Sequence, residues 1–509
     1  MSRFFSARGG HIKQGALLSY FALFVNVIIG LLYTPWLISS IGKSDYGLYT
    51  LAMSIIGLLA FDFGLGNATT KFVSQFLAEG RQDRVNNLLG LIYKLYLALD
   101  SLLLLCFIVI YFFLPNIYTG LTPEELERFS TVFIIASLYC VLSFPFIPLN
   151  GTLTSYELFV PLKACDLFHK VFIVIAMSVC LLLGYGLYAL VIVNSISGII
   201  TILLKLSIVN KKTPVQVEFR FWNLADLKMI FSFTIWITIS ALAQRLIFNI
   251  APSILGIFSD SQAIALLGIA ITLESYVYLF ANAINGMFLP RVSRLLHDNA
   301  QSNILELMIR VGRIQIFIIG FIFIWLAAFG KHFINVWVGE SYSLVYYCAL
   351  LIIFPSLFHL PQEIGLTYIV AANQVKKQSY VYIIMGLLNI ALAIPLSKYY
   401  GVLGICSAIC IVYIIRTIGL DVIFYKELHL NVFAFFKRSF IQLFPVFLVL
   451  FFIAFVIDYL IFSNGWIGLI VKSVLYTVFF IGLLWFFGFN SYEKETFVYT
   501  PLKKLKIKK

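Results

Sequence analysis

Long apolar segments recur along the whole chain, and they constrain its fold more than any other feature. A helix needs about 20 predominantly apolar residues to cross the hydrocarbon core of a bilayer. Fourteen segments reach that length, at residues 15–41, 46–78, 86–114, 130–151, 164–184, 186–209, 228–258, 262–296, 308–330, 343–370, 378–397, 402–424, 439–460 and 466–489. We therefore expect an all-α integral membrane protein with about 14 transmembrane helices.

The composition supports this expectation. Hydrophobic residues make up 61% of the chain and charged residues only 12%, whereas soluble domains have about 25% charged residues. Basic residues are retained on the cytoplasmic side of a membrane protein. If the N-terminus is cytoplasmic, all but six of the 36 Lys and Arg residues fall on cytoplasmic loops, tails or helix ends. Both termini are therefore expected in the cytoplasm.

The net charge of +13 is explained by the same rule together with anionic lipid of the inner leaflet. It therefore does not indicate nucleic-acid binding. The six exceptions to the cytoplasmic pattern fall into two groups. Lys43, Arg128, Lys331 and Lys398 would lie outside, and Arg245 and Lys472 would lie within spans.

Short strings recur in the same order at a nearly constant separation, which indicates an internal repeat. For example, Phe144-Pro145 recurs as Phe354-Pro355. Each half would hold six spans, so both halves would have the same orientation, with a substrate path between them as in many transporters. The expected parts are a basic cytoplasmic tail at 1–14, an N-lobe of spans 1–6 at 15–209, a cytoplasmic linker at 210–227, a C-lobe of spans 7–12 at 228–424, spans 13–14 at 439–489 and a basic cytoplasmic tail at 490–509.

Polar side chains inside the expected spans gather into stripes. An ionised side chain in the bilayer is costly, so it usually faces a water-filled cavity or a partner. At about 100° per residue, the polar residues of the seventh span share one face, and so do those of the eighth. The residues that we expect to line a central aqueous cavity are Asn26 in the first span, Asp62 in the second, Thr238, Arg245 and Asn249 in the seventh, and Glu274, Tyr278, Asn282 and Asn285 in the eighth.

The stretch FDFGLGNATTKFVSQ, residues 61–75, interrupts the second span. Its glycines and Asn67 leave backbone groups unpaired, which is tolerated at membrane depth only where protein or water satisfies them. We therefore expect a broken or bent helix that lines the cavity.

Purely structural roles remain open for the charged residues. Asp62 could pair with a neighbour to fix packing, Arg245 could clamp a kinked helix end, and Glu274 could tie helices together. No polar stripe accompanies Asp100, Glu363 or Lys472. For these three residues, packing or snorkelling is favoured.

No motif indicates catalysis or a bound group. The six histidines lack metal-ligand spacing, and the lysine loop of phosphate-binding ATPases is missing. The expected external loops are too short for a separate domain. We therefore expect neither an enzyme nor a cofactor or metal site.

Two stretches carry a resemblance to a known family. Residues 16–75 combine a long first span, the external turn IGKSDYGLY and a second span with the DFGLGNA break, and residues 371–408 pair two spans through a short external turn. This pattern resembles the bacterial polysaccharide (O-antigen, Wzx-type) flippases of the multidrug/oligosaccharidyl-lipid/polysaccharide (MOP) exporter superfamily. The resemblance covers the whole chain and implies a MOP/MATE-like fold of two six-helix lobes with an appended C-terminal helix pair.

The resemblance also implies a substrate and a membrane. The substrate would be an undecaprenyl-pyrophosphate-linked oligosaccharide, a repeat unit of O-antigen in lipopolysaccharide or of another surface polysaccharide. It would move by alternating access to the periplasmic leaflet of the bacterial inner membrane. Membrane lipids, a polysaccharide polymerase and glycosyltransferases are the implied partners.

Roles for individual residues follow from the same resemblance. Arg245, with Lys71 nearer the cytoplasmic mouth, would attract the pyrophosphate. The other expected substrate-binding residues are Asn26, Asn249, Asn282 and Asn285, and those expected to bind a coupling ion or line the cavity are Asp62, Glu274, Thr238 and Tyr278.

Three other functions compete with this one. A drug or metabolite cation antiporter of the same superfamily usually has twelve spans, so the extra pair argues against it. A flippase for lipid II, the peptidoglycan precursor, would be expected to have more than the one deep arginine of the cavity-lining helices. A membrane-embedded glycan polymerase would need a large external loop with basic catalytic residues.

Overall fold

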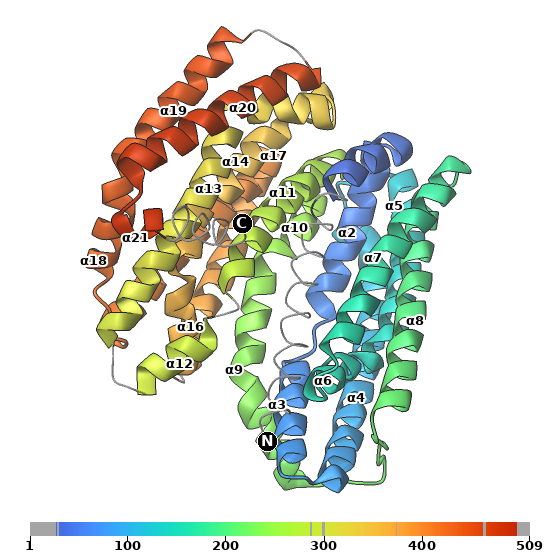
Figure 1. Ribbon diagram of the computed structural model, residues 1–509. Helices are drawn as coiled ribbons and strands as arrows, with labels where there is room; N and C mark the ends of the chain where they lie inside the picture. Colours follow the sequence, from blue (N-terminus) through green and yellow to red (C-terminus); the bar gives the residue numbers. More distant parts are fainter. Residues whose placement is uncertain are drawn as a thin grey trace, which may run out of the picture. The chain divides into compact units, whose positions relative to one another are not determined.

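The computed structural model describes residues 27, 30–285, 288–297, 301–372, 374–461 and 465–495. Within these residues every regular element is a helix and no strand occurs, which confirms the expected all-α class. Eleven of the helices are long and apolar enough to cross a membrane. The chain is therefore a multi-pass membrane protein (Figure 1).

The expected number of 14 spans remains a prediction, for three reasons. Most of the expected first span lies outside the described residues. The second is divided between α2 (Lys43–Leu59) and α3 (Leu65–Ala78), each shorter than a full span. The eleventh and twelfth both fall within the single element α17 (Val375–Lys426).

The chain reverses direction inside α17. Gly401 has φ 55° and ψ −132°, which a continuing helix cannot adopt. In a straight helix residues 396 and 404 would be about 12 Å apart. A Cβ on Gly404, however, would lie only 1.9 Å from the carbonyl oxygen of Leu396. The two expected spans are therefore separate helical segments that meet at a turn, and only a glycine fits where they cross.

The chain divides into two compact units. Unit 1 comprises Met1–Ile269 and Val375–Ile409, and unit 2 comprises Ala270–Gln374 and Cys410–Lys509. Contacts therefore group the seventh expected span with the first six. The division of the chain into an N-lobe at 15–209 and a C-lobe at 228–424 remains a prediction.

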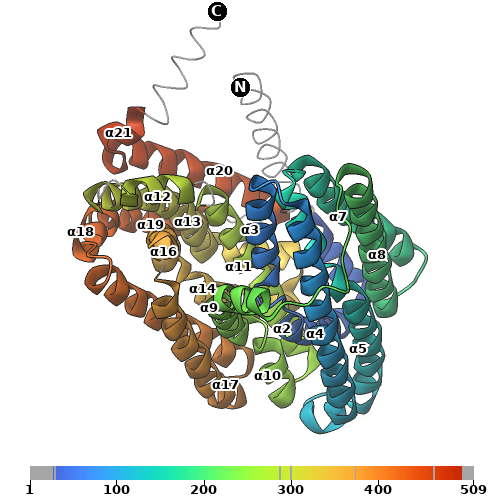
Figure 2. The ribbon, with the colours of Figure 1, turned by 90° about the horizontal axis from the view of Figure 1, so that it is seen from below.

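Unit 1 contains nine complete helices among its described residues, together with the first parts of α11 (Ser261–Asn285) and α17. The helices not yet given bounds are α4 (Gln82–Ile117), α5 (Pro123–Ser143), α6 (Pro148–Ser155), α7 (Phe159–Leu182), α8 (Leu187–Lys212), α9 (Leu224–Phe248) and α10 (Ala251–Phe258), and the 3-10 turn η1 (Phe144–Phe146) joins α5 to α6. Helices α7 and α8 lie side by side in both views (Figure 1, Figure 2). A cluster around Leu149, Leu153 and Val209 fills the space that they share with α6.

Unit 2 contains the remaining helices. They are α12 (Leu289–His297), α13 (Gln301–Trp337), α14 (Leu344–Ile353), α15 (Ser356–His359), α16 (Glu363–Ala371), α18 (Val432–Phe436), α19 (Gln442–Leu460), α20 (Gly465–Leu483) and α21 (Ser491–Lys494), with 3-10 turns η2 (Glu340–Tyr342) and η3 (Leu360–Gln362) and π-helical segments η4 (Lys437–Ile441) and η5 (Leu484–Gly488). Aromatic packing joins α13 to α20, where Phe321 stacks on the fully buried Tyr476 with ring centroids 5.1 Å apart.

Lys472, one of the two basic residues expected within spans, lies in this core of unit 2. Its ammonium group donates to Asp458 at 2.7 Å, and its side chain is 7% exposed. His332 of α13 lies 3.4 Å from the same ammonium group. These contacts bind α19 and α20 to α13, which agrees with the packing role favoured for Lys472.

Candidate functional site

The interrupted stretch at residues 61–67 forms a sharp break between α2 and α3, as expected from its composition. Phe63 and Gly64 have φ values of 51° and 70°, in the left-handed region that ends a helix. The carboxylate of Asp62 accepts hydrogen bonds from the backbone N–H of Gly64 at 3.2 Å and of Gly66 at 3.1 Å. Asp62 therefore satisfies the free donors at the start of α3, where a negative charge is also favourable.

Helix α9 holds this break in place. The hydroxyl of Thr238 donates to the carbonyl oxygen of Phe63 at 2.7 Å. A Cβ at Gly64 would come within 3.3 Å of the Ile237 side chain. Gly64 is thus required both by its positive φ and by the close approach of α9.

Helix α9 is itself kinked one residue beyond Arg245. Leu246 has ψ 15°, and the carbonyl oxygen that this kink frees accepts a hydrogen bond from the Asn389 amide of α17 at 3.0 Å. One turn further, the carbonyl oxygen of Asn249 accepts from the hydroxyl of Ser54 at 2.6 Å. Side chains from α17 and α2 therefore satisfy backbone groups around Arg245.

Arg245 is half-buried and lies next to the break. Its guanidinium carbon is 5.5 Å from the centroid of the Phe61 ring, and the Asp62 carboxylate is close enough to act on it electrostatically. Asp62, Thr238 and Arg245 are therefore neighbours, although they are far apart in the sequence. Arg245 and Asp62 therefore place a cation and an anion beside the helix ends at the break, within the membrane-spanning part of the protein.

Lys71 belongs to the same seam between α3 and α9 but at a different level. Its ammonium group lies 3.9 Å from the centroid of the Phe233 ring, and the side chain is exposed. From Phe233 to Arg245, α9 rises about 18 Å at 1.5 Å per residue. The two cations are thus separated along one seam and do not form a single cluster.

The remaining expected site residues lie elsewhere. Glu274 and Tyr278 belong to unit 2, where Glu274 is 7% exposed and Tyr278 is 44% exposed. Asn26 lies outside the described residues, and so do the side chains of Asn282 and Asn285. Within the described part of the chain, no group of three or more His, Cys, Asp or Glu side chains is arranged to hold a metal ion.

Sequence reasoning missed a buried arginine in unit 2. The charge pattern of the sequence predicts Arg416 at a cytoplasmic helix end, but the residue is only 6% exposed. It acts electrostatically on His359 and Glu363. Glu363 therefore has a charged neighbour inside the protein. The i, i+4 spacing of His359 and Glu363 is the feature of the sequence that could have indicated this buried polar group.

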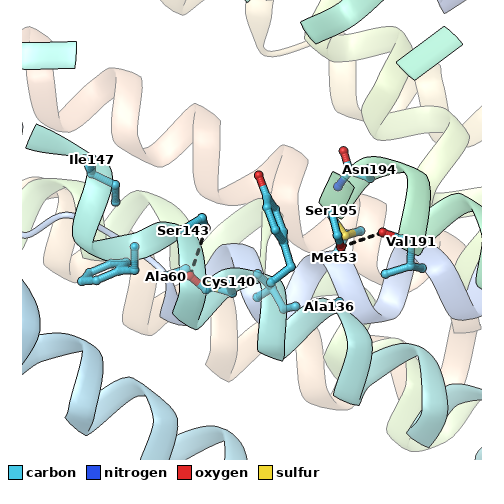
Figure 3. Close-up of a pocket in the computed structure, with 12 residues that line it drawn as sticks. Met53, Ala60, Ala136, Cys140, Ser143, Ile147, Val191, Asn194 and Ser195 are labelled. Atoms are coloured by element: carbon cyan, nitrogen blue, oxygen red, sulfur yellow. Dashed lines mark hydrogen bonds between the residues drawn. The ribbon is translucent and has the colours of Figure 1, made fainter. Parts of the chain in front are cut away.

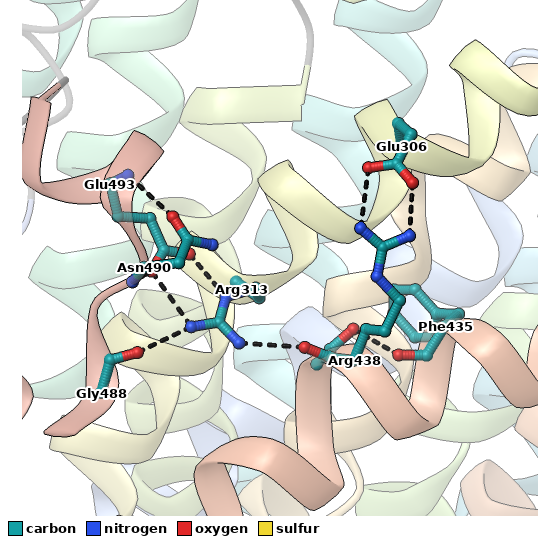
Figure 4. A network of polar contacts seen from close by, with 8 residues as sticks. Glu306, Arg313, Phe435, Arg438, Gly488, Asn490 and Glu493 are labelled. Atoms are coloured by element: carbon teal, nitrogen blue, oxygen red, sulfur yellow. Dashed lines mark hydrogen bonds and ion pairs between the residues drawn. The ribbon is translucent and has the colours of Figure 1, made fainter.

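The same charge pattern predicts Arg313 of α13 at a helix end, but this arginine is also buried. Its guanidinium forms a bidentate ion pair with Glu493, at 2.5 and 3.0 Å, and donates to the carbonyl oxygens of Arg438 and Gly488 (Figure 4). Arg313 and Glu493 are 4% and 3% exposed. Part of the expected basic tail is thus anchored in the core of unit 2.

Comparison with known proteins identifies the protein family of this chain and solved structures with a similar fold. A family model described as polysaccharide biosynthesis protein matches residues 12–296. No curated protein sequence matches the chain.

Among solved structures, the lipid II flippase MurJ in an inward closed conformation superposes with a TM-score of 0.68 at 15% identity, covering 92% of this chain and 97% of MurJ. A multidrug resistance MATE family transporter of the MOP superfamily, in an inward-facing conformation, has a TM-score of 0.63 at 13% identity and covers 78% and 99%. The eukaryotic MATE transporter AtDTX14 has a TM-score of 0.60 at 14% identity and covers 83% and 96%. The expected MOP/MATE-like fold is therefore confirmed.

Proposed function

Because the chain belongs to the polysaccharide biosynthesis protein family, we propose that it is a flippase for an undecaprenyl-pyrophosphate-linked oligosaccharide. The repeat unit, of O-antigen or another surface polysaccharide, moves by alternating access from the cytoplasmic to the periplasmic leaflet of a bacterial inner membrane, and both termini are cytoplasmic. A sugar-pyrophosphate head cannot cross hydrocarbon unaided, since buried charges and unpaired polar groups are costly there. A fold that also occurs in a lipid II flippase supports this proposal.

The observation that carries the proposal is the placement of Arg245. A guanidinium is the side chain best suited to bidentate binding of phosphate oxygens. Arg245 is half-buried at a kink of a membrane helix, beside the break between α2 and α3, and Asn389 and Thr238 satisfy the backbone there. The neighbouring Asp62 accepts hydrogen bonds from backbone N–H groups and forms no ion pair with Arg245 among the described residues, so the guanidinium N–H donors of Arg245 are available to phosphate oxygens.

Lys71 takes the first contact with the pyrophosphate in this proposal. It is exposed near one end of the α3–α9 seam, so it can attract an anion from solvent before Arg245 binds it deeper. Sugar hydroxyls or a coupling ion are assigned to the remaining polar residues, which are Asn26, Asp62, Thr238, Asn249, Glu274, Tyr278, Asn282 and Asn285. A polysaccharide polymerase and glycosyltransferases would supply and use the substrate.

The test is flipping by the purified protein in proteoliposomes. A fluorescent undecaprenyl-pyrophosphate-linked oligosaccharide is incorporated, and the fraction of headgroups accessible to a membrane-impermeant quencher is followed over time. We expect the wild type to expose headgroups, Arg245→Ala to stop doing so, and Arg245→Lys to recover part of the rate because it restores the charge without the bidentate geometry.

The matched control is Arg220→Ala, which removes an exposed arginine of the linker between α8 and α9. It should flip at the wild-type rate. Insertion of every variant is checked by its yield and monodispersity after extraction. Normal flipping by a well-inserted Arg245→Ala variant would remove Arg245 from the mechanism. If the protein transported lipid II and not the oligosaccharide lipid, lipid II would replace the proposed substrate.

A further inference from the structure

A partly open cavity of about 250 Å³ in unit 1 is lined by α2, α5 and α8. Most of its lining is apolar, but Ser143, Asn194 and Ser195 bring polar groups to it (Figure 3). Tyr139 is also part of the lining. The hydroxyls of Ser143 and Ser195 donate to carbonyl oxygens of their own helices. Within the described part of the chain the Asn194 amide has no hydrogen-bond partner. A cavity of this size and polarity has room for several water molecules.

Helix α5 lines this cavity and also packs against α4. The two helices run antiparallel, as two aromatic contacts show: Tyr96 meets Phe144 with ring centroids 5.5 Å apart, and Phe107 meets Phe133 at 5.8 Å. The same register brings Asp100 of α4 opposite Cys140 of α5. Cys140 also lines the cavity, and the Asp100 carboxylate is close enough to act electrostatically on its thiol.

The seam between α4 and α5 contains three buried polar atoms without a hydrogen-bond partner among the described residues. They are the hydroxyl oxygen of Tyr96, one carboxyl oxygen of Asp100 and the hydroxyl oxygen of Ser137. Tyr96 is fully buried, and Asp100 and Ser137 are 9% and 8% exposed. Unsatisfied groups of this kind are rare in folded proteins and call for a specific explanation.

Asp100 also lies midway along α4, a 36-residue membrane helix. The basic residue nearest to it on α4 is Lys94, whose ammonium group donates to the carbonyl oxygen of Phe221 and lies over the Trp222 ring, so it is held at the linker. Among the described residues, the titratable groups around the seam are Tyr96, Tyr139 and Cys140, and both Asp62 and Tyr93 act electrostatically on Tyr96. A carboxyl group in such surroundings, with no cation beside it among the described residues, is stable when it carries a proton.

We propose that Asp100 is a proton-binding site of unit 1, which exchanges its proton with water in the cavity at Cys140 and Asn194. In the protonated form the carboxyl group is neutral, and α4 and α5 pack against each other as in this structure. On release, the proton goes to cavity water, and the carboxylate that remains needs donors. The hydroxyls of Tyr96 and Ser137 are free to turn towards it. Release therefore changes the packing of α4 against α5, and through it the proton gradient drives transport; this coupling rests on the proposed flippase function.

The proton site is tested without transport by infrared difference spectroscopy of the purified protein during a pH titration. We expect a protonated-carboxyl band in the wild type that is missing in Asp100→Asn. Asp83→Asn, which changes an exposed aspartate in the first turn of the same helix, should keep the band. Tyr96→Phe keeps the ring contact and removes a donor to the carboxylate, so the band should persist to higher pH. Tyr96→Phe also tests the proton site if Asp100→Asn does not fold. An unchanged titration of the carboxyl band in Tyr96→Phe would then overturn the proposal.

The coupling is tested in the same proteoliposomes with an imposed pH difference. One pH unit across the membrane is about a tenfold ratio of proton activity, so one-proton coupling changes the distribution of substrate between leaflets by up to that factor. We expect this response in the wild type and Asp83→Asn but not in Asp100→Asn. If the flipping rate does not depend on the pH difference, the proton coupling is wrong, but the flippase function is unaffected. If instead the protein responds to a sodium gradient and Asp100→Asn abolishes that response, the coupled ion is a metal cation and not a proton. If no variant flips substrate, the flippase function fails, while the infrared titration still decides the proton site.

Discussion

The two Arg–Glu ion pairs at one end of unit 2 allow a sharp test of how burial controls their contribution to stability. Arg313 and Glu493 are 4% and 3% exposed, and the guanidinium makes two further hydrogen bonds to backbone carbonyl oxygens. Arg438 and Glu306 form an equally bidentate pair nearby, but their side chains are 45% and 39% exposed (Figure 4).

The perturbation is Arg313→Met, which keeps an unbranched apolar side chain as far as the position of Nε and removes the charged guanidinium group. Glu493 then stays buried without its partner, which costs about 3–5 kcal/mol for pairs of this kind. The exposed pair contributes about 0.2–1 kcal/mol, so Arg438→Met should lower the free energy of unfolding by no more than that. The double variant Arg313→Met, Glu493→Leu should recover much of the loss, because no buried charge remains.

The assay is equilibrium unfolding in mixed micelles of mild detergent and SDS, followed by tryptophan fluorescence. All four proteins are compared at the same protein and detergent concentrations. The reasoning would be refuted if Arg313→Met lost no more stability than Arg438→Met. It would also fail if the double variant were as unstable as Arg313→Met alone, because the loss would then come from packing or from the two carbonyl oxygens left without a donor, and not from an unpaired charge.

Three further predictions concern the break and the kink in unit 1. Gly64→Ala should lower the free energy of unfolding by about 1–2 kcal/mol, because φ 70° is unfavourable for alanine; the SDS titration measures it, and no loss would show that the break relaxes. Thr238→Val removes the part-buried hydrogen bond to the Phe63 carbonyl oxygen at a cost of about 0.5–1.5 kcal/mol, as for a typical intramolecular hydrogen bond, whereas Thr238→Ser should retain stability in the same titration. Asn389→Leu leaves the carbonyl oxygen freed at the kink without its donor, so the flipping rate should fall with Arg245 still present, and an unchanged rate would separate the kink from transport.

Much of the fold could be predicted from the sequence, because its causes are local along the chain. Hydropathy over about 20 residues determines which segments enter the bilayer, and it identified the apolar helices that the structure contains. The break at Asp62 and Gly64 was predictable for the same reason. Glycine at a positive φ and an aspartate that accepts from backbone N–H groups two and four residues ahead are local interactions.

The stripe on the seventh expected span also predicted that Thr238 and Arg245 share a face, since helical periodicity is local. The sequence could not show that this face meets Phe61 and Phe63 at the break. It also gave no sign that Asn389 satisfies the carbonyl oxygen at Leu246, because that partner lies 143 residues away.

Burial of individual charges was decided by the tertiary structure alone. Arg313 and Arg416 were expected at helix ends, and both are inside unit 2. The ion pair of Arg313 with Glu493 joins residues 180 positions apart, and the isolation of Asp100 depends on the register between α4 and α5. Hydropathy is a sum over neighbours in sequence, whereas the cost of a buried charge depends on which distant groups surround it. The sequence by itself therefore determined where the helices lie along the chain, and the packing between helices determined which charges are paired and which are left without a partner.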